Sequence, residues 1–401
     1  MSIGNIHPPE LTHSTDSESG RGLIGYTSAA ANSYPLYYFV PSHTADGRYL
    51  VFHSERTGWV QLYRLDLTTG EIIQLTDGTT RDSGWAIWCE PHLRGIYNHL
   101  SALEPTGGDV FYFQDEQIHA TNIYSLEHRV LTEIPGRIPI GQTGFSPDGN
   151  YFAFIHADRT LFTRAFADRE ARINMRQWNW GSDHDSWRHE VPSTISLVEV
   201  ATGALRDVIE LDYHVHHVFF LDAERLLINH PRDGSGMWTI RLDGTEERLL
   251  RPADGHGSIV HQVVTANGIY YEACKRLDGR RENWFGRYDP AADTFSEVQL
   301  PGMGYVHTGF DPAGKFLFFE NDDGATHQLL SVHFPRDPGR YALRQLKRLA
   351  PIGHGQRYHA HPFLSPDRTQ LFFTEVIDGF SQICALDVAD LVNLDEYWDC
   401  I

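Results

Sequence analysis

The sequence has few of the features that mark disulfide-stabilised, membrane-spanning or nucleic-acid-binding proteins. Its 4 cysteines are scattered and include no Cys-x-x-Cys pair, which favours reduced thiols in a cytoplasm. No apolar run approaches the roughly 18 to 20 residues that cross a bilayer. The 53 acidic residues outnumber the 33 basic ones, giving a formal net charge of -20. We therefore expect no nucleic-acid and no membrane partner, because both usually require a basic surface.

Several targeting and catalytic motifs are missing as well. The N-terminal segment has no basic stretch followed by an apolar one, so we expect a cytoplasmic protein without a secretory signal. There is no Gly-x-Ser-x-Gly, which argues against a propeller joined to an α/β-hydrolase peptidase. There is also no P-loop and no dinucleotide-binding fingerprint. Convincing helical stretches are nearly absent.

What the sequence does contain is a repeat. A small turn such as "SPDG", "ADG" or "SPDR" precedes a short apolar run such as "YLVF", "YFAF" or "LFFT", and an alternating strand such as "QLYRLDL" follows. Short alternating strands separated by turn residues are typical of antiparallel β-structure. Seven copies begin near Thr44, Thr106, Ser146, Leu221, Thr265, Asp311 and Ser365.

Repeats of about 40 to 60 residues built from short strands predict an all-β fold, a seven-bladed β-propeller. Each blade then covers the sheet face of its neighbour, and the closed ring leaves no exposed edge. We expect residues 22–401 to form this single domain, with residues 22–43 supplying strands to the blade near the C-terminus. Residues 1–21 are expected to be a partly disordered extension. The third copy carries a charged, Trp-rich insertion at about 162–191, which we interpret as a binding loop or lid.

Histidines recur at one place in the repeat. "GQRYHAHPFLSPD" places His359 and His361 just before the seventh turn, and residues two apart on an extended strand face the same side. Gln356 joins them if the chain bends nearby. Imidazole nitrogens and an amide oxygen suit Mn, Fe, Ni, Zn or a similar divalent ion. Histidines also stand near the start of the inner strand in the three preceding repeats: His217, His261 and His307. This pattern predicts a ring of imidazoles at one end of the propeller axis.

The same segment resembles a known family. "QRYHAHPFLSPD" is similar to the Gln-x-x-His-x-His-Pro-x-x-x-Pro-Asp signature of oligogalacturonate lyases, polysaccharide lyase family 22. "SIVHQ" and "GMWTIRLDG" resemble two further segments of that family, and the first repeat matches its first blade in style. The resemblance is thin between about Thr80 and Glu190. It implies a seven-bladed propeller, in agreement with the repeat count.

The resemblance implies a Mn²⁺ site and a lyase reaction. Its metal ligands would be His307, Gln356, His359 and His361, and its general base would be His261. The reaction would be a β-elimination that cuts short uronic-acid oligomers and leaves a 4,5-unsaturated uronate. A divalent ion on the C6 carboxylate would stabilise the charge that develops as a neutral histidine removes the C5 proton. The expected partner is a small acidic oligosaccharide, bound by a monomer or a small homo-oligomer.

One position departs from the family pattern. The arginine of the family's Arg-Met-Trp strand falls on Gly236. Arg232 on the same hairpin, as a catalytic residue, and Arg357 beside the metal glutamine, as a substrate-binding residue, are candidates to replace it, with a solvated surface position as the alternative for each. His217 and His230 are further candidates for sugar contacts, with purely structural roles as the alternative. Two other functions stay open: a lyase of the same type for another uronate linkage, such as a glucuronate-containing disaccharide, and a non-catalytic sugar- or protein-binding propeller.

Overall fold

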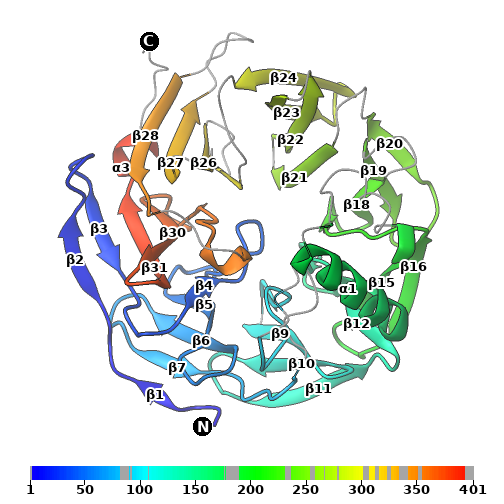
Figure 1. The fold of residues 1–401 in the computed structure, drawn as a ribbon, viewed down its shortest axis with the longest axis horizontal. Helices are drawn as coiled ribbons and strands as arrows, with labels where there is room; N and C mark the ends of the chain where they lie inside the picture. Colours follow the sequence, from blue (N-terminus) through cyan, green and yellow to red (C-terminus); the bar gives the residue numbers. More distant parts are fainter. Residues whose placement is uncertain are drawn as a thin grey trace.

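The structure is a computed structural model. It describes residues 2–392 except residues 82–89, 91–92, 107, 176, 178–188, 231–235, 253–257, 266, 278–279, 301–306, 312–315, 323–326, 334–341 and 351–354. The described strands form seven antiparallel sheets arranged around a central axis, so the predicted seven-bladed propeller is confirmed (Figure 1). Among the described residues, no helix is long and apolar enough to cross a membrane.

The first four blades follow the chain in order. Blade 1 consists of β4 (Ser33–Pro35), β5 (Tyr49–Ser54), β6 (Gln61–Asp66) and β7 (Ile72–Gln74), with β1 (Ile6–His7) outside. Blade 2 consists of β8 (Ala102–Leu103), β9 (Asp109–Gln114), β10 (Gln117–Asn122) and β11 (His128–Glu133). Blade 3 consists of β12 (Arg137–Pro139), β13 (Gly144–Phe145), β14 (Tyr151–Asp158), β15 (Ser193–Glu199) and β16 (Leu205–Leu211). Blade 4 consists of β17 (Val218–Phe220), β18 (Arg225–His230), β19 (Gly236–Arg241) and β20 (Arg248–Arg251).

The last three blades carry the candidate site. Blade 5 consists of β21 (Ser258–Thr265), β22 (Gly268–Leu277), β23 (Arg280–Asp289) and β24 (Thr294–Leu300). Blade 6 consists of β25 (Thr308–Phe310), β26 (Phe316–Asp322), β27 (His327–His333) and β28 (Ala342–Arg348). Blade 7 consists of β29 (Phe363–Leu364), β30 (Gln370–Ile377), β31 (Phe380–Asp387), β3 (Gly22–Gly25) and β2 (Thr12–Thr15). Two short helical segments flank blade 7, η2 (Gln356–Tyr358) and α3 (Ala389–Val392).

The repeated turn has a common chemical construction. A hydroxyl donates a hydrogen bond to the aspartate carboxylate two residues later and accepts one from the first backbone N–H of the following strand. The oxygen–oxygen distance is 2.6 Å in each of three repeats: Thr44 to Asp46, Ser146 to Asp148 and Ser365 to Asp367. Such side-chain bonds to the local backbone favour turns over helix. They fix where each inner strand ends and the second strand begins.

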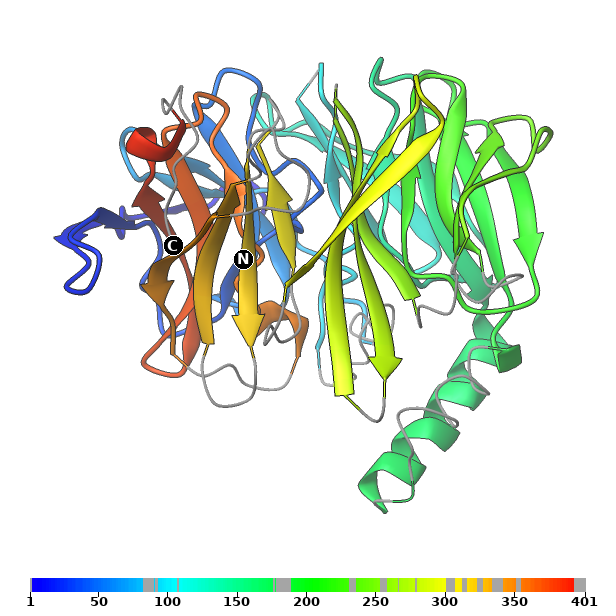
Figure 2. The same cartoon turned by 90° about the horizontal axis from the view of Figure 1, so that it is seen from above.

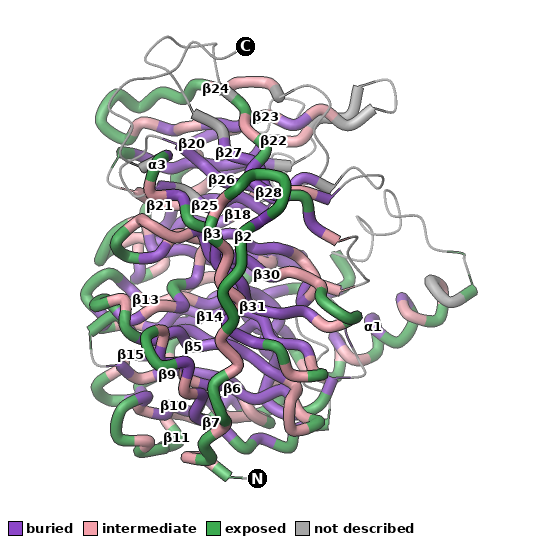
Figure 3. The backbone as a smooth tube through the Cα atoms, turned by 90° about the vertical axis from the view of Figure 1, so that its left-hand side faces the viewer, coloured by how far each residue is buried: buried purple, intermediate pink, exposed green. Residues whose placement is uncertain are grey.

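The N-terminal segment closes the ring. As expected, residues from the 22–43 stretch enter the last blade: β3 pairs with β31, with Ile24 opposite Ala385. The extension predicted over residues 1–21 contains β1, which pairs with β7 of blade 1, and β2, which pairs with β3. It therefore joins the first and last blades, and the exposed strand β2 forms the outer edge of blade 7, with β3 beside it (Figure 3).

The insertion of blade 3 departs from the disc. It leaves β14 at Asp158 and returns at β15, and its described part is α1 (Arg159–Asn174) with the residues next to it. Phe162 and Phe166 are buried, because apolar residues recur at helical spacing on one face of α1. Figure 2 shows α1 projecting away from one flat face of the propeller. The insertion thus contains a helix of 16 residues.

Candidate functional site

Six blades place a histidine or glutamine within three residues of the innermost strand, or inside it. All six side chains are at most 5% exposed, because they face the narrow space around the axis. In chain order they are His99, Gln142, His217, His261, His307 and His361.

Five of these residues form a continuous arc of imidazoles. The ring centroids of successive neighbours are 5.8 Å apart for His217 and His261 and 5.1 Å apart for His261 and His307. The arc continues from His307 to His361 at 4.4 Å and from His361 to His99 at 5.9 Å. Adjacent blades therefore bring these side chains to one place at the axis.

Three members of the arc have a strained backbone. His99, His261 and His361 have φ values of 57°, 53° and 44°. This left-handed region is uncommon for residues other than glycine and costs about 1 to 3 kcal/mol each. Non-glycine residues in such conformations gather at functional sites, where the surrounding structure enforces them.

The residues predicted as metal ligands lie together. The His307 centroid is 4.8 Å from that of His359 and 4.4 Å from that of His361, and the His359 and His361 centroids are 5.9 Å apart. Three imidazoles that share one ion through bonds of about 2.1 Å have centroids separated by roughly 4.5 to 5.5 Å. The spacing of the three rings is therefore close to that of a shared ion.

Gln356 completes the same group of donors. Its Oε1 lies 2.9 Å from His361 Nε2, and two ligands at right angles on one divalent ion are separated by roughly 3 Å. The other ring nitrogen of His361, Nδ1, is buried and has no hydrogen-bond partner in the described part of the chain. The donor set of imidazoles and a neutral amide oxygen fits a borderline divalent ion such as Mn²⁺.

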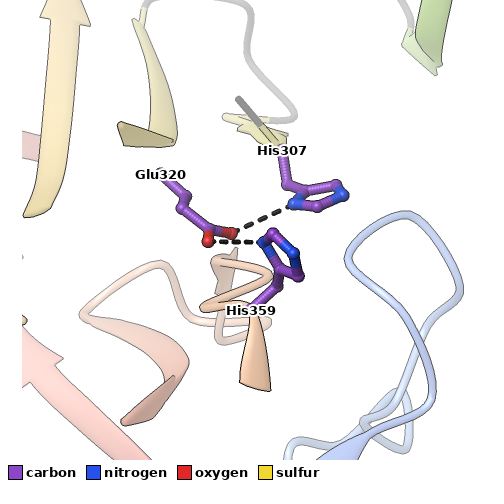
Figure 4. Close-up of side chains that lie close together, drawn as sticks. All are labelled: His307, Glu320 and His359. Carbon is purple, nitrogen blue, oxygen red and sulfur yellow. Dashed lines mark hydrogen bonds and ion pairs between the residues drawn. The ribbon is translucent and has the colours of Figure 1, made fainter. Parts of the chain in front are cut away.

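A buried glutamate, Glu320 on β26, lies behind these histidines (Figure 4). Its carboxylate oxygens are 3.0 Å from His307 Nδ1 and 2.8 Å from His359 Nδ1. The same carboxylate accepts the Ala360 N–H at 3.0 Å and contacts His327 Nε2 at 3.1 Å. His307, Glu320 and His359 form a group whose ligand atoms are close enough to hold a metal ion. Because both histidines use Nδ1 towards Glu320, their Nε2 atoms are on the opposite sides of the rings.

Burial and hydrogen bonding set the charges in this group. Burial lowers the pKa of His307 to about 4, although the Glu320 carboxylate works in the opposite direction. Burial alone would raise the pKa of Glu320, but the His359, His307 and His327 side chains hold it well below its usual range. His307 is therefore neutral and Glu320 ionised near neutral pH, which is the state that a metal-binding histidine and its supporting carboxylate require.

The predicted base, His261, has its own carboxylate. His261 Nδ1 lies 2.7 Å from Glu272 Oε2, and both side chains are buried. Glu272 comes from β22, and its other oxygen accepts a hydrogen bond from the Thr308 hydroxyl. This arrangement fixes the proton of a neutral His261 on Nδ1 and leaves the Nε2 lone pair to accept another.

The remaining predicted residues are placed less completely. His217 joins the arc next to His261, and its ring also contacts Phe39 at 5.5 Å. His230 ends β18 opposite Gly236, which opens β19, but the His230 side chain lies outside the described residues. Arg232 lies outside them as well. The roles of these residues in substrate binding stay predictions.

Arg357 is engaged within the protein. It lies in η2, is 7% exposed, and pairs with Glu55 of blade 1 at 2.7 Å and with Glu90 at 3.6 Å. Burial raises the pKa of Glu90 to about 7, opposed by the Arg357 charge. Asn98 donates a hydrogen bond to Glu90 at 2.8 Å. In this arrangement Arg357 ties the segment that carries Gln356 to the first blades; a direct contact with substrate stays a prediction.

An aromatic turn of blade 1, Leu36–Val40, fills the axis beside the histidines. Tyr37 contacts the rings of His361 and His99, at 4.7 and 5.9 Å, and Tyr38 contacts that of His261 at 5.6 Å. Tyr37 and Tyr38 are at most 5% exposed. We call this segment the aromatic plug. Blade 1 thus supports the arc through these tyrosines, although it supplies no histidine to it.

Sequence reasoning missed several of these residues. Gln142 precedes "SPDG" at the same spacing at which His361 precedes "SPDR", so an alignment of the repeats on their turns could have found it. His99 precedes the second repeat at Thr106 by seven residues rather than four, so this alignment would not have found it. Glu272 and Glu320 gave no such signal, because each lies in an ordinary strand and acquires its contacts only when the blades pack.

The fold and the site together define a seven-bladed propeller with a carboxylate-supported histidine cluster at its axis. No family model matches the chain. The oligogalacturonate lyase of Dickeya dadantii (strain 3937) is 19% identical over 402 residues, which cover 94% of this chain and 96% of that protein. The oligogalacturonide lyase of Pectobacterium atrosepticum is 20% identical over 98% of this chain and 100% of that protein.

A solved structure described as an oligogalacturonate lyase in complex with manganese has the same fold. It superposes with a TM-score of 0.77 at 19% sequence identity, and the match covers 98% of this chain and 100% of that one. The chain is therefore a distant homologue of oligogalacturonate lyases over nearly its whole length, as the sequence resemblance implied.

Proposed function

We propose that the protein is a divalent-metal-dependent lyase that cleaves short uronic-acid oligomers by β-elimination. The observation that carries this proposal is the grouping of His307, His359, His361 and Gln356 beside His261. The distant homology to oligogalacturonate lyases supports the same reaction class. The proposed products are a shortened oligomer and one that ends in a 4,5-unsaturated uronate.

In the proposed reaction, Nε2 of His261 accepts the C5 proton of the uronate. Its Nδ1 proton stays on the Glu272 side, so the imidazolium that forms is stabilised by a carboxylate. The C5–H electron pair becomes the C4–C5 double bond, the C4–oxygen bond breaks, and the leaving oxygen takes a proton from water. The His261 imidazolium returns its proton to the hydroxide so formed, which regenerates the neutral base. Bound Mn²⁺ would supply positive charge to the C6 carboxylate as negative charge develops there. His307, His359, His361 and Gln356 would hold that ion.

The first test follows the new conjugated double bond by ultraviolet absorbance. Purified protein with Mn²⁺ and di- or trigalacturonate is expected to show a steady rise, and His261→Ala is expected to slow it by roughly two to four powers of ten. His128→Ala serves as the control, because His128 lies on the outer strand β11 of blade 2. Full activity in His261→Ala would show that the base is another residue.

A second substrate class is favoured by Gly236. The resemblance places an arginine there, and a glycine supplies no charge to clamp a galacturonate carboxylate. A different linkage, such as that of a glucuronate-containing disaccharide, would satisfy the same metal and base. A panel of uronides distinguishes the two. Mn²⁺ binding without turnover of any uronide would favour a non-catalytic sugar- or protein-binding propeller. The cytoplasmic location and the oligomeric state stay predictions.

A further inference from the structure

Two glutamates stand at related places in adjacent blades. Glu272 on β22 and Glu320 on β26 both come from the second strand of their blade, and each bonds the Nδ1 atom of the arc histidine carried by its own blade. Their exposed fractions are 4% and 1%. A buried carboxylate is costly unless it is fully hydrogen-bonded, so each of these placements needs compensation from its partners.

Glu320 serves the predicted metal ligands. Besides His307 and His359, it accepts the backbone N–H of Ala360, which lies between the predicted ligands His359 and His361. One carboxylate thus fixes the two rings and the peptide that leads to the third. Because Nδ1 of both rings faces Glu320, Nε2 is the nitrogen available to an ion.

His327 stabilises the negative charge of Glu320. Its Nε2 lies 3.1 Å from Glu320 Oε1, and its Nδ1 lies 2.7 Å from the Ala350 carbonyl oxygen. Both neighbours are acceptors, so both bonds form together only when both ring nitrogens carry protons. His327 then balances the carboxylate with a positive charge, and Glu320 has a donor for each of its four contacts.

Glu272 serves the predicted base instead. It bonds His261 and, through its other oxygen, the hydroxyl of Thr308, the residue that follows His307. Thr308 is fully buried, and its hydroxyl connects Glu272 to the residue next to the predicted ligand His307.

We infer that these two carboxylates have different tasks, each supporting one part of the arc. Glu320, held by His327, is a positioning residue that orients the metal-binding histidines without being a ligand itself. Glu272 is a positioning residue that fixes the tautomer and raises the basicity of His261. The role of Glu272 rests on the proposed lyase function, whereas the role of Glu320 rests only on the metal site.

The test compares Glu320→Gln with Glu272→Gln in the full-length chain. Mn²⁺ affinity is measured by calorimetry and by the electron paramagnetic resonance signal of free Mn²⁺. Glu320→Gln is expected to weaken binding about 10- to 100-fold, the usual effect of losing a carboxylate behind a metal-bound histidine. Glu272→Gln is expected to leave the affinity unchanged. Equal losses in both variants, or an unchanged affinity in Glu320→Gln, would overturn the division.

The role of Glu272 is tested by enzyme kinetics instead. Glu272→Gln is expected to lower kcat with little change in KM and to move the acidic limb of the pH profile of kcat/KM to lower pH, since a neutral amide supports the imidazolium less well. Glu320→Gln, saturated with Mn²⁺, is expected to keep that limb where it is in the wild type. An unmoved limb in Glu272→Gln would overturn the role of Glu272.

Failure of the proposed function is distinguishable from failure of this inference. If the wild type turns over no uronide, the Mn²⁺ measurements still decide the role of Glu320. The role of Glu272 is then read from ¹⁵N-histidine long-range spectra, in which the His261 signals, assigned by their loss in His261→Gln, must show the proton on Nδ1 and lose this preference in Glu272→Gln. Should Glu320→Gln not fold, His327→Gln replaces it, with a smaller loss of Mn²⁺ affinity expected and an unchanged affinity counting against the role of Glu320.

Discussion

At the scale of single residues, the metal site depends on a glycine. Gly355 precedes η2 with φ of 117°, a conformation that side chains rarely adopt, and an added Cβ would collide with Glu90 Oε1. Gly355→Ala is therefore expected to displace Gln356, lowering Mn²⁺ affinity by at least about tenfold and stability by about 1 to 3 kcal/mol. Calorimetry and urea unfolding measure the two effects. Gly379→Ala is the control, because Gly379 also has a positive φ but open space around it; equal Mn²⁺ affinities in the two variants would contradict the argument.

Single residues also show how far sequence reasoning reaches. The histidines could be predicted, because each stands at a fixed distance from a turn that the sequence marks clearly. Glu320 could not, since it bonds His307 of its own blade and His359 of the next, and that pairing exists only after two blades pack. The sequence also contains no sign that Glu55, from the first blade, pairs with Arg357.

At the scale of elements, the strands could be predicted from alternating apolar residues and from turn residues, whereas the aromatic plug could not. Residues 22–43 are strand-like in composition, and β3 and β4 come from them, but Leu36–Val40, directly after β4, forms a turn that fills the axis. Its residues are as apolar as those of a strand. Only the closed ring creates a space at the axis that such a segment can fill, so no local pattern could distinguish the two outcomes.

The plug gives a prediction of its own. Tyr37 is fully buried and its ring contacts His361 at 4.7 Å and His307 at 6.1 Å. Tyr37→Ala is expected to cost about 3 to 5 kcal/mol of stability through the cavity it leaves and to weaken Mn²⁺ binding, because the histidines lose their support. Tyr37→Phe keeps the ring and is expected to lose less than about 1.5 kcal/mol. Urea unfolding and calorimetry of both variants check this, with Tyr124→Ala, at an exposed tyrosine, as the surface control. A Tyr37→Ala protein as stable as Tyr124→Ala would refute the supporting role of the plug.

At the scale of the whole molecule, buried histidines couple stability to pH. Burial lowers the pKa of His43, His119 and His156 to about 4, with further lowering by His128 at His119 and by Arg137 at His156. Burial also lowers the pKa of His53 to about 3. The closed ring produces this effect, because it packs these side chains between or within blades, where a charged imidazole is poorly solvated.

The sign of the coupling follows from these shifts. An unfolded histidine takes up its proton near pH 6.5, whereas these four take it up only near pH 4 or below in the folded protein, so the unfolded state binds more protons between those values. Stability is therefore expected to fall as the pH drops from about 6.5 to about 4. Glu90 works in the opposite direction, because its pKa of about 7 lets the folded state keep a proton that the unfolded chain loses. One carboxyl group does not offset four histidines, and these five groups together contribute at most about 4 kcal/mol per pH unit to the slope.

Urea unfolding of the metal-free protein at a series of pH values measures this slope, and His43→Leu isolates one contribution to it. His43 packs against Phe363 and Phe372, with ring centroids 5.3 and 4.5 Å away, and its Nε2 has no hydrogen-bond partner in the described part of the chain. Leucine suits that apolar position and cannot be protonated. We expect His43→Leu to match or exceed the wild type at pH 7.5 and to lose less stability on acidification, the difference growing by up to about 1.4 kcal/mol per pH unit below pH 6. Parallel pH curves for the two proteins would show that His43 is not held neutral by the fold.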